Sequence, residues 1–294
     1  MARGRRIEFP WVQQLPELAS ADFMRFLVTF AIDAEFSPWR ARHPFVPYDF
    51  DNASRKRDFD MFRANIGVNE VTVLLTGMGG ASARRAMQIV PPELHDVWIA
   101  TGLAGALDAE LKLSTIVVAN QATTSDWSTR VASDPRLVRA AVACAATRVE
   151  TFLTSETIVA TALAKEELRA VGNVVEMETA FILAAAQERQ MPSVALRAIS
   201  DTAEEDLPLD FSKIADAKGH LKVGGLLLEL ARQPYRLPLL IKFGRQSRAA
   251  ATSLADFLDR YLAAVATEGR AGQFADDLTQ VARETRPRKE GWLH

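Results

Sequence analysis

Carboxylates stand at the ends of short apolar runs in the sequence, where they could act on a bound ligand. Glu35 follows the run 25–32, Asp201 follows the run 193–199, and Glu178 opens the predicted helix that precedes the second run. In a parallel α/β sheet the carboxyl ends of the strands meet at one edge, and ligands bind there. Three carboxylates gathered at that edge would cost free energy unless a ligand used them, so their placement indicates acid–base chemistry.

Two segments containing glycine follow two further apolar runs. Residues 76–80 read TGMGG, and residues 101–107 read TGLAGAL. Taken singly, such glycines often only make a tight turn, and a carboxylate at the start of a helix usually caps it. Their combination at one sheet edge favours a ligand site over these structural roles.

The elements that must position these residues alternate between strands and helices. Runs rich in β-branched and aromatic residues predict buried strands, and amphipathic or alanine-rich segments predict helices. This alternation predicts an α/β protein with a mostly parallel sheet covered by helices on both faces. The predicted strands are 25–32, 71–76, 97–101, 115–119 and 193–199, and the predicted helices are 81–89, 137–149, 162–170 and 177–189.

Composition excludes several classes of protein. The chain has 294 residues, of which 48% are hydrophobic, so it can bury a large core and is not a disordered chain. Its net charge of −2 lacks the basic excess of a nucleic-acid-binding protein. The only cysteine, Cys144, cannot form an internal disulfide, and the four histidines lack the spacing of metal ligands. We therefore expect no metal and no cofactor.

Three regions differ in character along the chain. We expect an irregular N-terminal arm over residues 1–22, an α/β domain over 23–215 and a helical C-terminal extension over 216–294, with a bend at Pro234 and Pro238. No stretch approaches the ~18 consecutive apolar residues of a transmembrane helix. The basic start lacks the apolar run of a signal peptide, so a cytoplasmic location is expected.

The order and the residues of the motifs resemble those of one family. FAIDAEF, the GMGG loop, TGLAGALDAELKLSTIVVA, VVEMETAFILAAA and ALRAISDTA follow one another within residues 25–206. This succession resembles the nucleoside phosphorylase and nucleosidase superfamily, on the 5′-methylthioadenosine/S-adenosylhomocysteine nucleosidase side. The resemblance implies a three-layer α/β/α sandwich around a mixed, mostly parallel sheet. It also implies a homodimer, because such nucleosidases complete the pocket with a loop of the neighbouring subunit.

The resemblance implies roles for the residues around the two most specific motifs. Asp201 of RAISD would protonate N7 of a departing purine, with Ser200 positioning the acid or the base and Arg197 as a structural partner. Proton donation of this kind is typically worth 10²–10⁴-fold in rate. Glu178 of EME would hold the ribose hydroxyls and stabilise positive charge on the sugar, because a carboxylate accepts from two hydroxyls at once.

Further residues of these segments would contact the substrate. Met177 would pack under the sugar, and Glu176 would assist Glu178. Leu103, Ala104 and Gly105 of the third strand's loop would lie beside the base and the sugar. Relatives often carry a small polar residue where Leu103 stands.

The first-strand loop bears on how the glycosidic bond is cleaved. In the nucleosidase branch a glutamate there activates water, and Glu35 holds that place. The loop lacks the glycine and arginine pattern with which phosphorylases bind phosphate, which favours hydrolysis. Phosphorolysis stays open, since Arg40, Arg42 and Arg84 could still reach the site.

Two departures from the family concern the choice of substrate. Where relatives stack a phenylalanine on the base, this chain has TSETIVATA, so Ile158 would face the purine and Val159 would offer backbone groups. Met78 stands where relatives contact the 5′ substituent of the ribose, and its apolar side chain favours an uncharged, apolar group. Leu103 and Ile158 leave a third alternative, a ligand-binding or membrane-associated module on a decayed nucleosidase fold that binds nucleosides without turnover.

The C-terminal extension adds a possible membrane contact. Residues 231–255 carry five basic residues and no acidic one, interleaved with large apolar residues. Such a segment can lie on an anionic membrane or simply pack on the core. It is similar to the tail of hopanoid-associated phosphorylase-like proteins, which release adenine from a lipid-linked adenosyl group. We expect this tail to lie away from the sheet-edge site.

Overall fold

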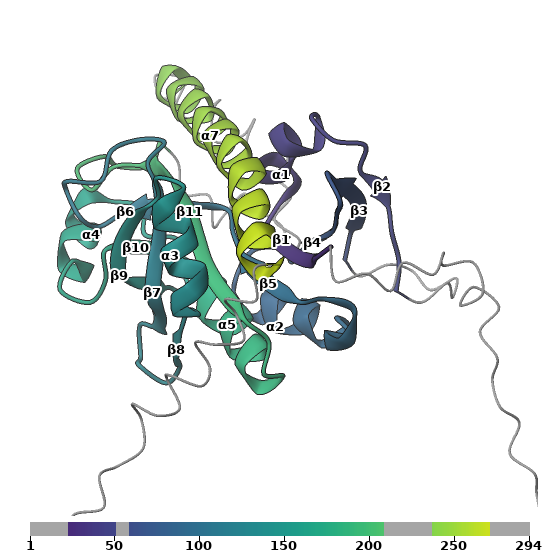
Figure 1. Ribbon diagram of the computed structural model, residues 1–294. Coiled ribbons are helices and arrows are strands. Elements are labelled where there is room, and N and C mark those ends of the chain that lie inside the picture. Colours follow the sequence, from purple (N-terminus) through teal and green to yellow (C-terminus); the bar gives the residue numbers. More distant parts are fainter. Residues whose placement is uncertain (1–22, 51–58, 209–236, 271–294) are drawn as a thin grey trace, which may run out of the picture.

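The computed structural model describes residues 23–50, 59–208 and 237–270 (Figure 1). An eleven-stranded mixed sheet runs through it in the order β2-β3-β4-β1-β5-β11-β6-β10-β9-β7-β8. The strands are β1 (Arg25–Phe30), β2 (Val46–Pro47), β3 (Met61–Ile66), β4 (Asn69–Leu75), β5 (Val97–Ala100), β6 (Leu103–Ala106), β7 (Ile116–Thr124), β8 (Arg130–Ala132), β9 (Thr147–Thr154), β10 (Val174–Glu176) and β11 (Ser193–Asp201). The helices are α1 (Asp33–Arg40), α2 (Gly80–Gln88), α3 (Pro135–Ala143), α4 (Ala162–Leu168), α5 (Thr179–Glu188) and α7 (Leu237–Arg270), with a short 3₁₀ turn at Pro92–Leu94.

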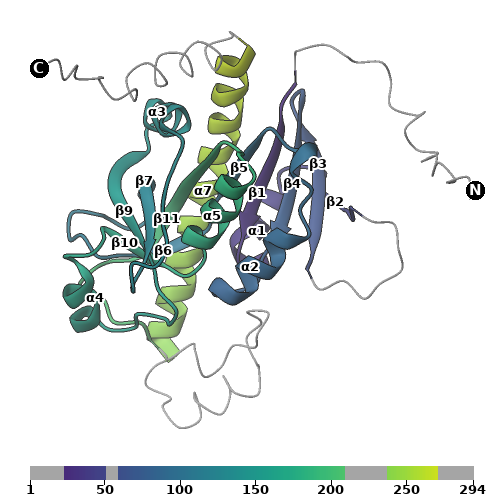
Figure 2. The ribbon, with the colours of Figure 1, turned by 90° about the horizontal axis from the view of Figure 1, so that it is seen from below.

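Helices cover both faces of the sheet, which confirms the predicted three layers (Figures 1 and 2). On one face α1, α3 and α7 pack in a single apolar cluster that includes Trp39, Leu137 and Leu258. On the other face α2 and α5 pack in a second cluster around Met87 and Phe181. The predicted strands and helices at the centre of the chain are therefore those that build the core.

Half of the sheet closes on itself. Strand β11 pairs in parallel with β6 and antiparallel with β7, and β10 and β9 complete the ring between them. This closure brings the ends of β5, β10 and β11 around the short strand β6. The predicted site residues lie near β6 or in the segments that follow β1 and β4.

The prediction of five strands was incomplete, and the helices predicted over 137–149 and 177–189 were too long. Strands β2, β3, β6, β8, β9 and β10 were missed; most of them are short, and β6 contains a glycine. The helix predicted over 137–149 ends at Ala143, because Ala145 adopts a left-handed φ of 73° and β9 begins at Thr147. The helix predicted over 177–189 begins at Thr179, because Glu176 still belongs to β10.

The long helix α7 confirms the expected helical extension and is fastened to the rest of the protein. Its Asp259 carboxylate accepts from Trp39 Nε1 at 2.7 Å and pairs with His43 at 2.8 Å. Tyr261, which is fully buried, donates its hydroxyl to the carbonyl of Leu137 at 3.0 Å. Pro238 lies in the first turn of α7, where proline fits a helix. The predicted bend at Pro234 lies outside the described residues, as do the predicted arm and both ends of the predicted extension.

None of the helices in the described ranges combines the length and the apolar character that crossing a membrane requires.

Candidate active site

Glu35 joins the end of β1 to the start of β6. It lies in the first turn of α1, and its Oε2 accepts the amide of Ala31 at 2.9 Å. Its Oε1 accepts the amide of Leu103 at 3.0 Å. Burial raises the pKa of Glu35, while these amides and the charge of Arg197 oppose the rise. A raised pKa makes the Glu35 carboxylate a stronger base than an exposed one.

Glycine at position 102 makes this contact possible. Gly102 has φ of +144°, and a Cβ there would lie 3.0 Å from the carboxylate of Glu35. Any larger residue would strain the backbone and push against Glu35. The glycine of the TGLAG motif is thus explained by a close approach and not only by a turn.

Glu178 lies in the β10–α5 connection, and its side chain reaches the GMGG loop. Its Oε1 accepts the amide of Gly79 at 2.6 Å, and the residue is only 7% exposed. Burial, followed by the negative charge of Glu176, raises the pKa of Glu178 to about 8. The side chain of Met177 reaches the same loop, since its Cε lies 3.9 Å from the place of a Cβ on Gly79. Met78 lies beside Gly79 in this loop and is partly buried.

Glu176 serves the framework of the site. Its Oε2 accepts from Arg197 at 2.7 Å and from the amides of Glu178 and Thr179 at 2.9 and 2.8 Å. Its other oxygen accepts from the hydroxyl of Thr154. With both oxygens occupied in this way, Glu176 fixes the turn that presents Glu178, and Arg197 is its structural partner.

Asp201 ends β11 and has a partner on each oxygen. Oδ1 accepts from the hydroxyl of Ser200 at 2.8 Å, and Oδ2 accepts from Lys165 Nζ at 2.6 Å. A Cβ on Gly105 would lie 2.8 Å from Oδ2, so glycine is needed where β6 passes the carboxylate. The Ser200 hydroxyl also lies 3.2 Å from the carbonyl of Ala104, which ties the end of β11 to β6.

Lys165 was not predicted from the sequence as a residue of the site. It lies on α4, is fully buried and forms an ion pair with Asp201. A signal was present, because Ala162, Lys165 and Leu168 share one face of a short helix at a spacing of three. A lysine at the centre of the face that a helix buries points to a buried acidic partner.

A small cavity of about 130 Å³ brings several predicted residues together. Gly105, Ile158, Val159, Met177 and Asp201 all line it, together with Thr157, Val175, Glu176 and Leu207. The residues expected beside the base thus share one cavity with the residue expected to protonate it.

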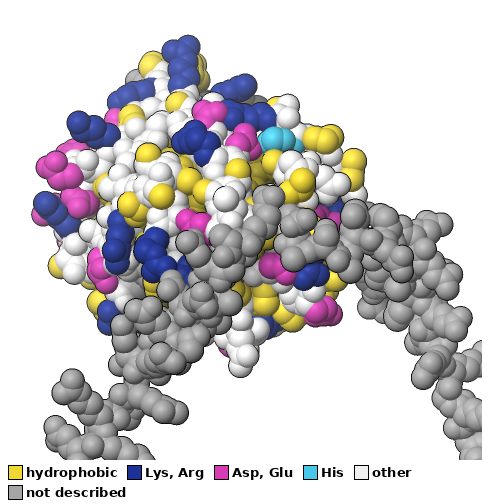
Figure 3. Space-filling view, in the orientation of Figure 1, with side chains coloured by type: hydrophobic (Ala, Val, Ile, Leu, Met, Phe, Trp, Pro, Cys, Tyr) yellow, Lys and Arg dark blue, Asp and Glu magenta, His cyan; other side chains and the backbone are white. Residues whose placement is uncertain are grey.

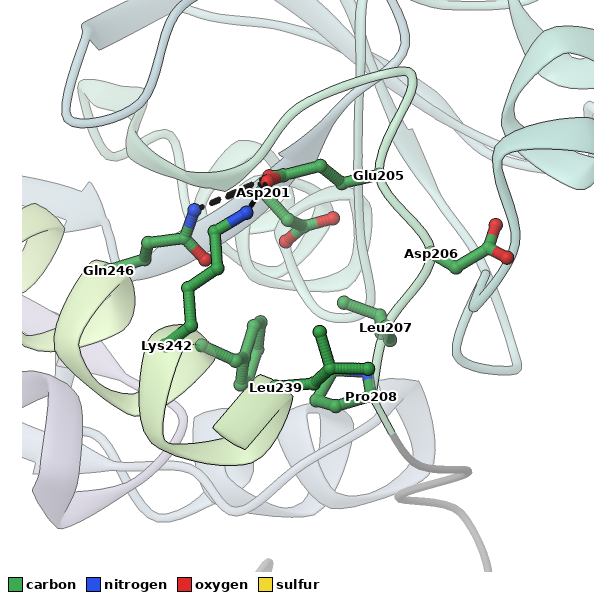
Figure 4. A pocket seen from close by; sticks show the side chains of 9 residues that line it. Asp201, Glu205, Asp206, Leu207, Pro208, Leu239, Lys242 and Gln246 are labelled. Atoms are coloured by element: carbon green, nitrogen blue, oxygen red, sulfur yellow. Dashed lines mark hydrogen bonds and ion pairs between the residues drawn. The ribbon is translucent and has the colours of Figure 1, made fainter. Parts of the chain in front are cut away.

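A larger cavity of about 400 Å³ shares Asp201 and Leu207 with the small one. Figure 4 shows Lys242 and Gln246 of α7 directed at Glu205, and Leu239 next to Pro208. Lys242 Nζ lies 2.7 Å from Glu205 Oε1. The expectation that the C-terminal segment lies away from the site is therefore wrong: the first turns of α7 form one wall of a cavity that reaches Asp201.

The fold and the motifs are those of a known family. The family model of the phosphorylase superfamily matches residues 27–232, so the chain belongs to that superfamily. A comparison with curated proteins gives no match.

Solved structures of nucleosidases share the fold. The 5′-methylthioadenosine/S-adenosylhomocysteine nucleosidase of Neisseria meningitidis, in complex with methylthio-immucillin-A, is similar at 21% identity and a TM-score of 0.61. The corresponding nucleosidase of Campylobacter jejuni has 16% identity and a TM-score of 0.61, and a futalosine hydrolase mutant of Helicobacter pylori has 16% and 0.59. Each comparison covers 81% of this chain and 98% of the other chain.

The raised pKa of Glu178 predicts how stability depends on pH. Between its unfolded pKa near 4.5 and its folded pKa of about 8, the native state holds a proton that the unfolded chain releases, so this group's contribution to stability falls as pH rises. Glu178→Gln removes the dependence and should become progressively more stabilising relative to wild type from pH 5 to 8. Urea unfolding across this range measures the difference. Glu188→Gln, at the exposed end of α5, is the control. A constant difference for Glu178→Gln would contradict the assignment.

Proposed function

We propose that the protein is a nucleosidase that hydrolyses the N-glycosidic bond of a purine nucleoside with an apolar 5′ substituent. The observation that carries the proposal is the placement of Glu35 and Asp201 at the two ends of residues 102–105, together with Glu178 bound to the GMGG loop. Each carboxylate has a different set of donors, so the three are suited to different tasks.

The proposed reaction assigns one task to each carboxylate. Glu35 takes a proton from water as the water oxygen bonds to C1′ of the ribose. Glu178 binds the ribose hydroxyls, and in its ionised form it stabilises the positive charge of the sugar in the transition state. The bond from C1′ to the base breaks, and Asp201 gives a proton to N7 of the departing purine. Free base and free sugar are the products.

The interactions of three arginines favour hydrolysis over phosphorolysis, because each arginine already has a partner. Arg40 pairs with Asp33 at 2.7 Å, Arg42 pairs with Asp256, and the guanidinium of Arg84 lies 3.9 Å from the centre of the Phe181 ring. Phosphate binding needs strong donors directed at the site. The arginines that could have served a phosphate are thus engaged elsewhere, which supports water as the nucleophile.

The cavities support an apolar substituent. Leu207, Pro208, Leu239 and Phe243 make up most of the apolar lining of the larger cavity. A charged 5′ group would lose its hydration against such a wall without gaining enough donors in return. In the small cavity Ile158 and Val159 line the space in which the base would bind. The base would then be held by apolar contacts and by Asp201.

Substitution of the proposed acid and base tests the mechanism. Glu35→Gln and Asp201→Asn should each lower kcat for base release by about 10²-fold or more, because each removes a proton-transfer group. Release of base is followed by chromatography on a panel of 5′-substituted purine nucleosides, and circular dichroism checks the fold. Base release at the wild-type rate from either variant would remove that residue from the mechanism. Nucleoside binding by wild type without any turnover would favour the alternative of a decayed binding protein.

We further propose that the first turns of α7 touch an anionic membrane. Leu237, Leu239 and Ile241 are about half exposed, and Arg245 and Arg248 are exposed beside them. Figure 3 shows basic and apolar side chains together at the upper tip of the molecule, where α7 begins. A cavity with Leu207, Leu239 and Phe243 in its lining, next to such a surface, fits the lipid-linked substrate that the resemblance of the tail implies. The cytoplasmic location and the homodimer remain predictions.

Neutralising Arg245 and Arg248 together should weaken binding to anionic vesicles. At about 1 kcal/mol per charge near the surface, the loss is roughly 30-fold, and rising salt should reduce wild-type binding as well. Sedimentation with vesicles of mixed neutral and anionic phospholipid measures it. Turnover of a small soluble nucleoside should be unchanged, because neither arginine lines the cavity. Failure of the wild type to sediment with these vesicles would refute the membrane contact.

A further inference from the structure

Lys165 is completely buried and uses all three of its protons within one short segment. Its ammonium lies 2.6 Å from Asp201 Oδ2, 2.7 Å from the carbonyl of Thr202 and 2.8 Å from the carbonyl of Glu205. An ammonium group has three donors and no acceptor, so this set satisfies it fully. The side chain thus binds the carboxyl group of Asp201 and the turn that follows it as one unit.

The scaffold around this ammonium is held by other bonds. Thr161 caps α4 by accepting the amide of Ala164, and the amide of Ala162 donates to Asp206 at 2.7 Å. The amide of Leu207 donates to the carbonyl of Ala160, also at 2.7 Å. These bonds join α4 to the segment after β11 without the help of Lys165. Burying an ammonium is costly even when it is paired, so packing alone does not explain a lysine here.

Other charged groups face this region but have partners of their own. Glu176 lines the small cavity and is bound by Arg197, while Glu205 is bound by Lys242 on α7. Asp206 lies at the rim and caps the amide of Ala162. Within the described residues, Lys165 is therefore the cation in direct contact with Asp201.

We propose that Lys165 is a positioning residue for the proposed acid: it aims the Asp201 carboxyl group into the small cavity and sets the pH range over which that group carries a proton. This inference rests on the proposed function for its catalytic consequence. The ammonium binds Oδ2 and Ser200 binds Oδ1, so the carboxyl plane is held from both sides.

The charge of Lys165 has two opposite effects on catalysis. When Asp201 gives its proton to the base, a buried carboxylate forms, and the adjacent ammonium stabilises it. The same ammonium disfavours the protonated form of Asp201 before the reaction, so activity is lost at a lower pH on the alkaline side. A merely structural lysine would change neither quantity in this linked way.

Substitution at Lys165 separates the two effects. Lys165→Gln keeps a hydrogen-bond donor and loses the charge, whereas Lys165→Arg keeps the charge. We expect Lys165→Gln to lower kcat by about tenfold or more with little change in KM, and to move the alkaline limb of the kcat profile upward by about one pH unit or more. Lys165→Arg should keep the alkaline limb near its wild-type position. Lys112→Gln, at an exposed lysine far from Asp201 in sequence, is the matched control and should behave as wild type.

A measurement without turnover tests the same claim. With the carboxyl carbons of aspartate labelled with ¹³C, the Asp201 signal is assigned by its loss in Asp201→Asn and followed through a pH titration. Its midpoint should rise by about one pH unit or more in Lys165→Gln. An unchanged midpoint, or a loss of kcat without movement of the alkaline limb, would overturn the proposal. If the wild type releases no base, the proposed function fails while the titration still decides whether Lys165 controls Asp201.

Discussion

The short strand β6 passes between carboxylates, and the bonds that satisfy those carboxylates determine much of the surrounding structure. A buried carboxylate without partners is too costly to persist in a folded protein. Glu35 is satisfied by backbone amides from two strand ends, Glu178 by the amide of Gly79, and Asp201 by Ser200 and Lys165. The bonds from Glu35 to Leu103, from Glu178 to Gly79 and from Asp201 to Lys165 join elements that are distant in the sequence, so they also hold the sheet edge together.

The helix α7 supports the site from outside. Near its middle it binds α1, which carries Glu35, through the contacts of Asp259 with Trp39 and His43. In its first turns Lys242 binds Glu205, whose carbonyl accepts from Lys165. A single helix thus contacts the elements that hold the proposed base and the proposed acid. This arrangement explains why a segment that reads as an appendage in sequence belongs to the same apolar core as the sheet.

The sequence predicted the placement of the main carboxylates because local patterns determine it. Apolar runs followed by glycine or acidic residues mark the ends of buried strands, and Glu35 and Asp201 do lie at such ends. Lys165 was missed because its partner is 36 residues away, and only the docking of α4 against β11 brings them together. Strand β9 was missed because the end of α3 depends on one left-handed residue, Ala145, that carries no glycine or proline signal. The cavity wall formed by α7 depends on tertiary packing and has no local signature.

The central claim is that water, activated at Glu35, attacks C1′ of a bound nucleoside. The most direct test is to run the reaction on 5′-methylthioadenosine and related apolar nucleosides in water labelled with ¹⁸O, with and without inorganic phosphate, and to identify the sugar by mass spectrometry. The account predicts base release in both conditions, with one ¹⁸O atom in the free sugar. Base release only in the presence of phosphate, with an unlabelled sugar 1-phosphate as product, would contradict it.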